Sequence, residues 1–266
     1  MKLTDKIASI NQRHWDWAVK KGAGCTIPWL DLNPEVLKLY AKDRLKSVPE
    51  QFEEIYPSYV LKDVDGKDVL CLATGGGQQS AVFSLLGAKV TVLDLSKGQL
   101  DGDRRAAAHY GYQVNTIQAD MRDISFFTSK SFDLVYQGNS MAWIPDVKPV
   151  YTGVKRVLRS GGLYRVDFSN PATEFVDWHS WDGEGYRITF PYDEKVEHPG
   201  TKGEQDYMQF RHYMSEIFNG LLEVDMSIQY VQDSPHYFKC KKQEIPGEWD
   251  HWLRYVGGFA VVAQKK

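Results

Sequence analysis

Short apolar runs alternate with helix-forming segments between residues 68 and 168, and this alternation restricts the chain to a small set of folds. The runs cover residues 68–73, 89–94, 113–119, 132–136 and 162–168, and each has the length of a buried strand. Helical patterns occupy residues 78–86, about 100–110 and about 148–159 between them. Strands that alternate with helices in this way form a parallel, doubly wound sheet. We therefore predict an α/β fold.

The first sixty residues have a different pattern, which predicts helices without strands. Apolar residues at three- and four-residue spacings predict an amphipathic helix over residues 3–20. Asn33 followed by Pro34 predicts the start of a second helix. Ser47 and Glu50 have the spacing of a capping box and predict a third helix.

The alternation also stops after strand 162–168. Residues 170–207 are rich in Trp, Tyr, Pro and Gly and are predicted to form an insert, followed by a helix over about 207–222. Strands are expected again at residues 223–231 and in the apolar run 258–263, and we expect this last run to pair as an antiparallel edge of the sheet.

Composition argues against several classes of protein. Apolar residues make up 42% and charged residues 25% of the chain, as in ordinary globular proteins. A net charge of −3 gives no general attraction to nucleic acid or to an anionic membrane, so neither partner is expected. No apolar run approaches the 18 residues of a membrane span, and the N-terminus lacks the apolar segment of an export signal.

Three widely separated cysteines, Cys25, Cys71 and Cys240, argue against a disulfide framework and against a close-spaced zinc site. We therefore expect a cytoplasmic protein without a bound metal.

A glycine-rich turn, Ala73-Thr74-Gly75-Gly76-Gly77, joins the first strand to a helix. Glycine at such a turn lets a cofactor approach the backbone more closely than a Cβ would allow. Asp94 ends the second strand about twenty residues later, where a carboxylate can accept the ribose hydroxyls of an adenosine cofactor.

Two alternatives compete with this interpretation of the turn: a tight loop without a ligand, and a dinucleotide site. The dinucleotide fingerprint G-x-G-x-x-G needs a third glycine beneath the pyrophosphate. The chain has Gly75 and Gly77 but Ser80 at the third place. This weakens the prediction of a nicotinamide oxidoreductase without excluding it.

Polar positions also follow the third and fourth strands. Asp120 and Met121 end the third strand, where the acid can receive the amino group of an adenine and the thioether can lie on the ring; Asp120 could equally be a helix N-cap. Gln137-Gly138-Asn139-Ser140 follows the fourth strand at the same edge of the sheet. The strand ends thus converge on one crevice, where open α/β sheets bind ligands.

These motifs resemble, in order, those of the class I S-adenosylmethionine-dependent methyltransferases. The resemblance covers roughly residues 68–168 and is carried by residues 69–77, 90–96, 118–123, 132–137 and 157–168. It implies a Rossmann-like, mostly parallel seven-stranded sheet with an antiparallel last strand, and S-adenosylmethionine as the cofactor.

Carried over to this sequence, the resemblance implies a role for each motif. Gly75 and Gly77 would line the methionine portion, Asp94 would hold the ribose, Asp120 and Met121 the adenine, and Gln137 would start the loop beneath the sulfonium. The full set of expected cofactor-binding residues is Ala73, Thr74, Gly75, Gly77, Gln78, Gln79, Asp94, Leu95, Asp120, Met121, Gln137 and Gly138. One departure is Ala73, because the family often has an acidic residue at that place. The contact to the methionine amine is then expected to come from elsewhere.

In the family, segments before the first strand and after the fifth enclose the methyl acceptor, and both are aromatic in this chain. The residues expected to contact the acceptor are Trp15, Trp29, Asn139, Trp143, Trp178 and Tyr192. Aromatic walls attract cations and exclude water, although aromatic residues on a helix or lid are more often ordinary packing. His179 is a candidate general base because its reference pKa is near 6.5, although a lone histidine is more often structural.

The sequence thus predicts a helical lid over residues 1–60 and a methyltransferase domain over residues 61–266, with the insert at about 170–207 closing over the acceptor. The predicted reaction is methyl transfer to a small molecule. The alternatives are methylation of RNA or protein, and a binding module without catalysis. The sequence specifies neither the acceptor nor the oligomeric state.

Overall fold

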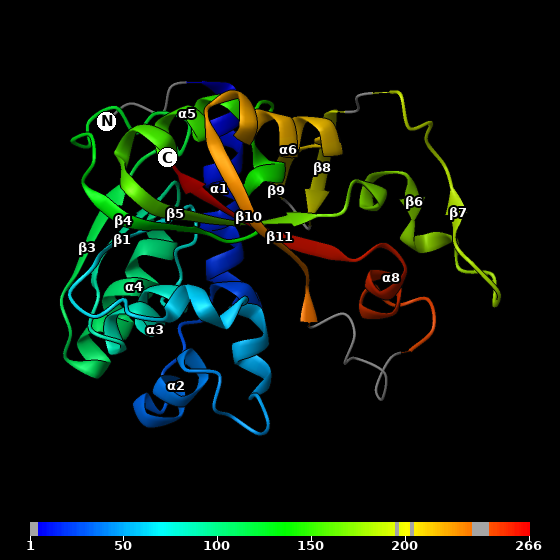
Figure 1. Cartoon of the computed structure of the whole chain (residues 1–266). Helices are drawn as coiled ribbons and strands as arrows, with labels where there is room; N and C mark the ends of the chain where they lie inside the picture. The colour runs from blue at the N-terminus through cyan, green and yellow to red at the C-terminus, as the bar shows by residue number, and fades with distance from the viewer. Residues whose placement is uncertain (1–4, 195–196, 203–204, 236–244) are drawn as a thin grey trace.

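The structure is a computed structural model that describes residues 5–194, 197–202, 205–235 and 245–266 (Figure 1). In this part of the chain the main sheet has seven strands, in the order β10-β11-β5-β4-β1-β2-β3. Their bounds are β1 Asp68–Leu72, β2 Lys89–Asp94, β3 Val114–Gln118, β4 Phe132–Gln137, β5 Leu158–Ser169, β10 Met226–Asp233 and β11 Gly258–Lys265.

The pairing of these strands confirms the predicted Rossmann-like sheet. The strands β3, β2, β1, β4 and β5 are parallel neighbours, and β11 pairs antiparallel with both β5 and β10. The strand order reverses at β1, which lies between β2 and β4. A crevice opens at such a reversal, outside the carboxyl ends of the strands.

Helices cover both faces of the sheet (Figure 1). On one face α2 Pro34–Ala41, α3 Gln79–Leu85 and α4 Lys97–Tyr110 pack on a core that includes Val69, Val92 and Leu134. On the other face α5 Lys148–Val157 and α6 Met214–Glu223 pack on Leu70 and Val166. Central strands that are apolar on both faces need this double cover.

The N-terminal helix α1 Lys6–Lys20 is fixed to a hairpin formed by β8 Glu197–Lys202 and β9 Gln205–Phe210. Asn11 of α1 makes three bonds: Nδ2 donates to the carbonyl oxygens of Met208 at 2.9 Å and Trp143 at 3.1 Å, and Oδ1 accepts from the Met208 amide at 2.8 Å. A buried amide with this many partners holds one arrangement of α1 against the domain.

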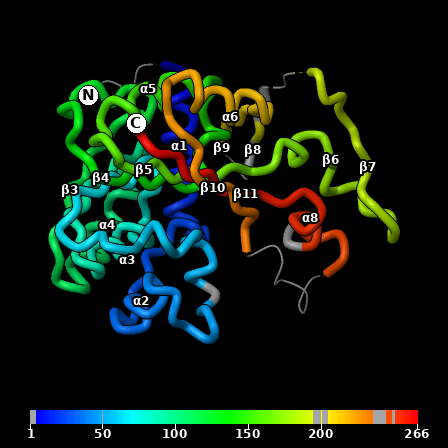
Figure 2. Tube along the Cα trace, viewed as in Figure 1, coloured from blue at the N-terminus to red at the C-terminus, as the bar shows by residue number. Residues whose placement is uncertain are grey.

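The insert after β5 lies to one side of the sheet (Figure 2). It includes the short strands β6 Val176–Asp177 and β7 Arg187–Ile188, and it contacts α8 Trp249–Val256. The indole Nε1 of Trp252 donates to the carbonyl oxygen of Val176 at 3.0 Å. No helix among the described residues is long and apolar enough to cross a bilayer.

The helix predicted from Ser47 and Glu50 is wrong, because residues Glu50–Glu54 form a 3-10 turn instead. Pro49 disfavours helical backbone at the residue before it, and Pro57 prevents continuation beyond Tyr56.

The helix predicted over 207–222 is wrong at its start. Residues 205–210 belong to β9, paired with β8, and α6 begins only at Met214. Cross-strand pairing with β8 overrides the local helical pattern there.

The apolar run 258–263 was expected at the edge of the sheet, and this expectation is also wrong. It belongs to β11, which lies between β5 and β10 with nearly every residue buried. A continuous apolar run is typical of a strand with neighbours on both sides. The more polar β10 takes the edge, and it begins at Met226 because α6 extends to Glu223.

Candidate active site

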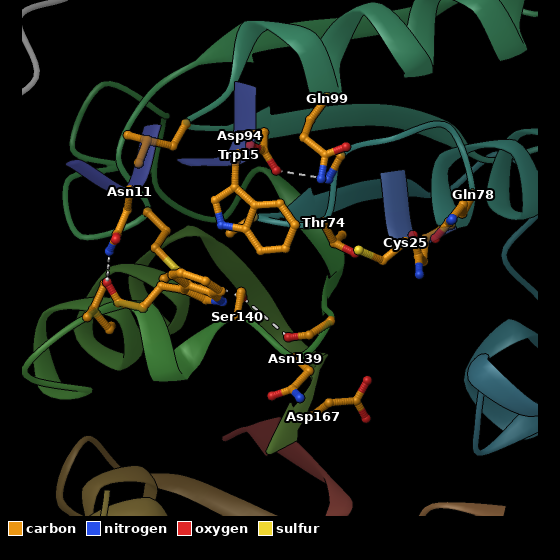
Figure 3. A pocket seen from close by; sticks show the side chains of 18 of the residues that line it. Asn11, Trp15, Cys25, Thr74, Gln78, Asp94, Gln99, Asn139, Ser140 and Asp167 are labelled. Carbon is orange, nitrogen blue, oxygen red and sulfur yellow. Dashed lines mark hydrogen bonds between the residues drawn. The ribbon is translucent and has the colours of Figure 1, made fainter. Parts of the chain in front are cut away.

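A cavity of about 800 Å³ opens at the carboxyl ends of β1, β2, β4 and β5 (Figure 3). Its wall runs from the glycine-rich turn and Asp94, past Asp120, to Trp15 of α1, and continues to Asp167 of β5. Ligand sites in proteins have volumes of roughly 300–1,000 Å³. The cavity is therefore large enough for a cofactor and a small second molecule.

The glycine-rich turn is held from below by a carboxylate of α4. Asp103 is wholly buried and accepts from the backbone amides of Gly76 at 3.2 Å and Gly77 at 3.0 Å, and from the hydroxyl of Ser80 at 2.5 Å. Burial raises the pKa of Asp103 to about 7, while the hydrogen bond from Ser80 opposes the rise. Sequence reasoning missed this residue, because nothing in the local pattern of a helix marks an inward-facing acid.

Gly77 shows why the turn needs glycine. Its φ is +81°, and a Cβ there would lie 2.5 Å from the carbonyl oxygen of Gly102 in α4. The turn and α4 can therefore approach each other only without side chains at this point.

The bonds to Asp103 have a consequence for the choice between cofactors. A dinucleotide site directs the free amides of such a turn at a pyrophosphate. Here the amides of Gly76 and Gly77 are directed at an internal carboxylate instead, and Ser80, which replaces the third glycine, donates to the same group. The turn is thus arranged for a cofactor without a pyrophosphate.

Asp94 lies beside the turn with both carboxylate oxygens facing backbone amides. Oδ2 accepts from Gly75 at 3.0 Å and Oδ1 from Ser96 at 2.9 Å. Burial raises the pKa of Asp94 to about 6, and the backbone bonds limit the rise. A carboxylate has about four acceptor sites, so Asp94 can take a further donor, such as a ribose hydroxyl.

Gln99 of α4 is a second site residue that sequence reasoning missed. It lines the cavity, the residue is only 6% exposed, and its Oε1 is buried without a hydrogen-bond partner. A Cβ at Gly75 would lie 2.8 Å from the Gln99 Cβ and 3.1 Å from the Asp94 Oδ2. An orphaned acceptor beside Asp94 fits the ribose of an adenosine cofactor, because a bound hydroxyl would satisfy it.

Asp120 is joined to α1 through Arg122. The guanidinium Nε lies 3.0 and 2.9 Å from the two Asp120 oxygens, and its Nη1 and Nη2 donate to Asp5 at 2.7 and 3.0 Å. Arg122 lines the cavity. Since Asp5 caps α1 by accepting from the Ala8 amide at 2.9 Å, the start of this helix is tied to the predicted adenine site.

Asp16 makes a second connection between α1 and the cofactor side of the cavity. Its Oδ1 accepts from the hydroxyl of Ser96 at 2.6 Å and from the amide of Gly98 at 3.1 Å. Ser96 in turn donates its amide to Asp94. The helix α1 is therefore fixed at both ends to segments that surround the cavity.

Met121 and Gln137 lie together, but only Met121 lines the cavity. The Gln137 amide is wholly buried: its Oε1 accepts from the Tyr164 hydroxyl at 2.6 Å, and its Nε2 donates to the Ser140 hydroxyl at 2.9 Å and to the Met121 sulfur at 3.3 Å. Gln137 thus supports the Met121 side chain from behind.

An aromatic wall faces the turn across the cavity. The rings of Trp15 and Trp143 lie edge to face with centroids 5.0 Å apart, and Figure 3 places Trp15 between Asp94 and Ser140. Its position follows from α1, which Asn11 fixes to the Trp143 carbonyl.

The structure brings most of the predicted site residues together. Those that line the cavity are Ala73, Thr74, Gly75, Gln78, Gln79, Asp94, Leu95, Asp120, Met121, Gly138, Trp15, Asn139 and Trp143. Gly77 and Gln137 lie directly behind the wall and shape it through their bonds to Asp103 and Met121.

Four predicted acceptor-side residues do not lie on the cavity wall. Trp29 packs against the core around α2 and α3. The rings of Trp178 and His179 lie tilted against each other, with centroids 3.7 Å apart, and His179 is exposed. Tyr192 is 54% exposed and lies beside Arg211. Trp178, His179 and Tyr192 belong to the insert, whose position the sequence pattern did not predict. Of the cysteines, Cys25 lies at the cavity wall, Cys71 is buried, and Cys240 lies outside the described residues.

The doubly wound sheet has an antiparallel last strand, and the Gly76 and Gly77 amides of its turn are bonded to an internal carboxylate. Both features fit the class I methyltransferase fold. Comparisons with known proteins agree with this class. Residues 70–166 match the family model described as a methyltransferase domain. The chain is a class I S-adenosylmethionine-dependent methyltransferase, and S-adenosylmethionine is its cofactor.

Two curated relatives indicate how far the similarity extends. An uncharacterized methyltransferase, YbaJ, of Bacillus subtilis is 28% identical over 227 residues, which cover 80% of this chain and 85% of the relative. A ubiquinone biosynthesis O-methyltransferase of Vibrio atlanticus is 27% identical over 147 residues, which cover 54% of this chain and 58% of the relative. The second match spans less than two thirds of that relative.

Solved structures share the fold. A methyltransferase from Mesorhizobium loti has a TM-score of 0.60 at 21% identity and covers 89% of this chain and 100% of its own. The geranyl diphosphate C-methyltransferase of Streptomyces coelicolor has a TM-score of 0.62 at 14% identity and covers 99% of each chain. At these identities the likeness concerns the fold alone.

Proposed function

We propose that the protein transfers the methyl group of S-adenosylmethionine to a small-molecule acceptor held between α1 and the ends of β4 and β5. The bound cofactor supplies an activated methyl group on a sulfonium. The observation that carries the proposal is one continuous cavity, in which the predicted cofactor residues occupy one part and Trp15, Trp143 and Asn139 border the remainder. An enclosed second region of this kind suits a small acceptor.

The residues that would hold the cofactor follow from their free hydrogen-bonding groups. Asp94 and Gln99 would receive the ribose hydroxyls, since one has spare lone pairs and the other an orphaned oxygen. Asp120, oriented by Arg122, would receive the adenine amino group, and Met121 would lie against the ring.

The protein's own contribution to the transfer is orientation and exclusion of water. The ties of α1 through Asp5, Asn11 and Asp16 hold Trp15 over the cavity, so that an acceptor and the methyl group can be kept in one alignment. Residues 1–60, acting as a lid on a domain of residues 61–266, would supply this wall. His179 is not required in this arrangement, because an acceptor that is already nucleophilic needs no base.

The names of similar proteins support a small acceptor. One relative carries the name of a ubiquinone biosynthesis O-methyltransferase, and one protein of the same fold methylates geranyl diphosphate according to its description. The formal net charge of −3 also favours a small molecule over RNA. A cytoplasmic location would suit such an enzyme.

Calorimetric titration with S-adenosylmethionine, S-adenosylhomocysteine and NAD in parallel tests the cofactor half of the proposal. We expect micromolar binding of the first two and none of NAD. Incubation with methyl-labelled cofactor and a panel of small acceptors, with total RNA and a protein mixture in separate reactions, tests the other half. Label transferred only to RNA or to protein would contradict the proposal.

A further inference from the structure

The cavity extends beyond the predicted cofactor residues to a polar region that we call the acceptor end. It consists of Glu54, Tyr56, Asn139, Asp167 and Ser234, all on the cavity wall. Glu54 and Asn139 are exposed at its rim, whereas Tyr56 and Ser234 are buried. In Figure 3 the Asn139 and Asp167 side chains lie at the opposite side of the pocket from Gln99.

Asp167 is held in this region by an arginine that no solvent reaches. Arg165 is 0% exposed, and its Nη2 lies 2.6 Å from the Asp167 Oδ1. The guanidinium also donates from Nε to the carbonyl oxygen of Tyr56 at 2.6 Å. It lies over the ring of Tyr136, 4.4 Å from the centroid. A planar cation fixed on three sides can take few orientations, so it also fixes the carboxylate.

The carboxylate nevertheless keeps hydrogen-bonding capacity. Its Oδ1 is buried against Arg165 Nη2, 2.6 Å away, so the exposed part of the side chain belongs to its other atoms. The Asp167 side chain is 16% exposed, toward the cavity that it lines. Burial raises the pKa of Asp167, while Arg165 and the Tyr56 hydroxyl oppose the rise. A carboxylate has about four acceptor sites, so one that borders a cavity can still accept from a bound donor.

The charges on the cavity wall also favour a ligand group that donates hydrogen bonds over an anionic one. Among the described residues that line the cavity, Arg122 is the one lysine or arginine, and it is bound to Asp120 and Asp5 on the cofactor side. The acceptor end contains two carboxylates, two hydroxyls and an amide, and its amide Nδ2 already donates to the Ser169 hydroxyl at 2.9 Å. An anionic group would find like charge there and no cation on the wall to pair with it.

We propose that the acceptor end binds the methyl acceptor through an amine or hydroxyl group that donates to Asp167, with Arg165 as the residue that positions this carboxylate. Carboxylate and phosphate acceptors are disfavoured at this place. The inference rests on the proposed function and adds the chemical class of the acceptor to it.

Three probes with one ring and different head groups test the proposal: benzylamine, benzyl alcohol and benzoate. Their affinities are measured by ligand-observed NMR on the full chain saturated with S-adenosylhomocysteine. We expect benzylamine and benzyl alcohol to bind at least tenfold more tightly than benzoate. Benzoate binding as tightly as the other two, or none of the three binding, would overturn the proposal.

An isosteric variant adds a second comparison. Asp167→Asn removes the charge and replaces one acceptor oxygen by a donor, so the preference for benzylamine over benzoate should fall to less than threefold. Asp101→Asn, on the exposed face of α4, is the matched control and should keep the full preference. If the Asp167→Asn variant kept the full preference for benzylamine, groups other than Asp167 would cause that preference, and the proposal would be overturned.

The titration of S-adenosylhomocysteine separates this proposal from the broader one. If the Asp167→Asn variant binds this compound within threefold of the affinity of the unmodified chain, the cofactor part of the cavity is intact. If the unmodified chain itself does not bind it, the proposed function fails. The comparison of probes on the unmodified chain needs no variant, so a folding defect in Asp167→Asn leaves the proposal testable.

Discussion

Replacement of Asp103 by alanine should disorganise the glycine-rich turn without touching the cofactor cavity directly. Asp103 does not line the cavity, yet it accepts from the amides of Gly76 and Gly77 and from the Ser80 hydroxyl. Ser80 can rotate its hydroxyl to another acceptor. The amide of Gly77, in contrast, would lose an acceptor that no other described group replaces.

The size of the effect follows from these lost bonds. A buried donor left without a partner costs roughly 1–3 kcal/mol, so the two amides give roughly 2–6 kcal/mol for the variant. The Gly76 amide also approaches the Gln99 carbonyl at 3.1 Å, which places the expected value in the lower half of that range. With a urea slope of about 3 kcal/mol/M, the unfolding midpoint should fall by about 1 M.

The raised pKa of Asp103 gives the effect a pH dependence. Because the pKa is about 7 in the folded chain against 3.8 for a free carboxyl, the native state binds its proton more tightly than the unfolded chain. The free energy of unfolding therefore contains a contribution that is present below about pH 4 and is lost as pH rises to about 7. The alanine variant lacks this contribution, so its loss of stability should be larger at pH 5 than at pH 8.

Urea unfolding of the unmodified chain, Asp103→Ala and Asp101→Ala at both pH values, together with titration of S-adenosylhomocysteine, measures these effects. Asp101 lies on the same helix but is exposed and paired with Arg104, so its replacement should change stability little. Asp103→Ala should also bind the compound at least tenfold more weakly. If its stability and affinity match those of Asp101→Ala, the turn is held by other contacts and our reasoning fails.

Three further predictions concern the cavity. Because burial raises the pKa of Asp94 to about 6, affinity for S-adenosylhomocysteine should fall as pH drops from 7 to 5. The Asp94→Asn variant should bind this compound more weakly and with no dependence on pH. If the variant kept the pH profile of the unmodified chain, the assignment of Asp94 to the ribose would be contradicted. Gln99→Leu should weaken binding of adenosine about tenfold but leave 2′,3′-dideoxyadenosine unaffected, whereas equal losses for both would remove Gln99 from the ribose site. Since His179 is exposed and off the cavity wall, His179→Ala should keep the turnover number once an acceptor is known; a loss of turnover without weaker cofactor binding would restore it as a base.

The central part of the fold, residues 68–168, could be predicted because its strands and turns are encoded locally. Residues 68–72 and 89–94 are apolar runs bounded by glycine or by a polar strand end, and burial in a parallel sheet requires such runs. Because the apolar run of β2 ends at Asp94, the place of this residue at the strand end could also be predicted. Outside residues 68–168 the pattern predicted α1 and the start of α2, but it was misleading at β9, where pairing with β8 decides the structure.

The parts of the site that the sequence pattern missed are set by contacts between distant segments. Asp103 and Gln99 lie on a helix with ordinary composition, and only the packing of α4 on the turn gives them partners or an open cavity. Likewise, Arg165 and Asp167 alternate along β5 like any strand residues. Their pair is fixed in place because the Arg165 guanidinium lies over the rings of Tyr56 and Tyr136, which come from distant segments.

The inner position of β11 determines how the sheet is completed during folding. Gly258 of β11 pairs with Ser169 of β5, so these two strands are neighbours in the sheet although the insert and β10 separate them in the sequence. Until this long-range pairing forms, β5 has one open edge, which can pair with another chain and aggregate. The closure entropy of so long a connection varies only with the logarithm of its length, by about 0.6 kcal/mol for each doubling. The insert can therefore lengthen or shorten at small thermodynamic cost, without weakening the sheet that holds the cofactor.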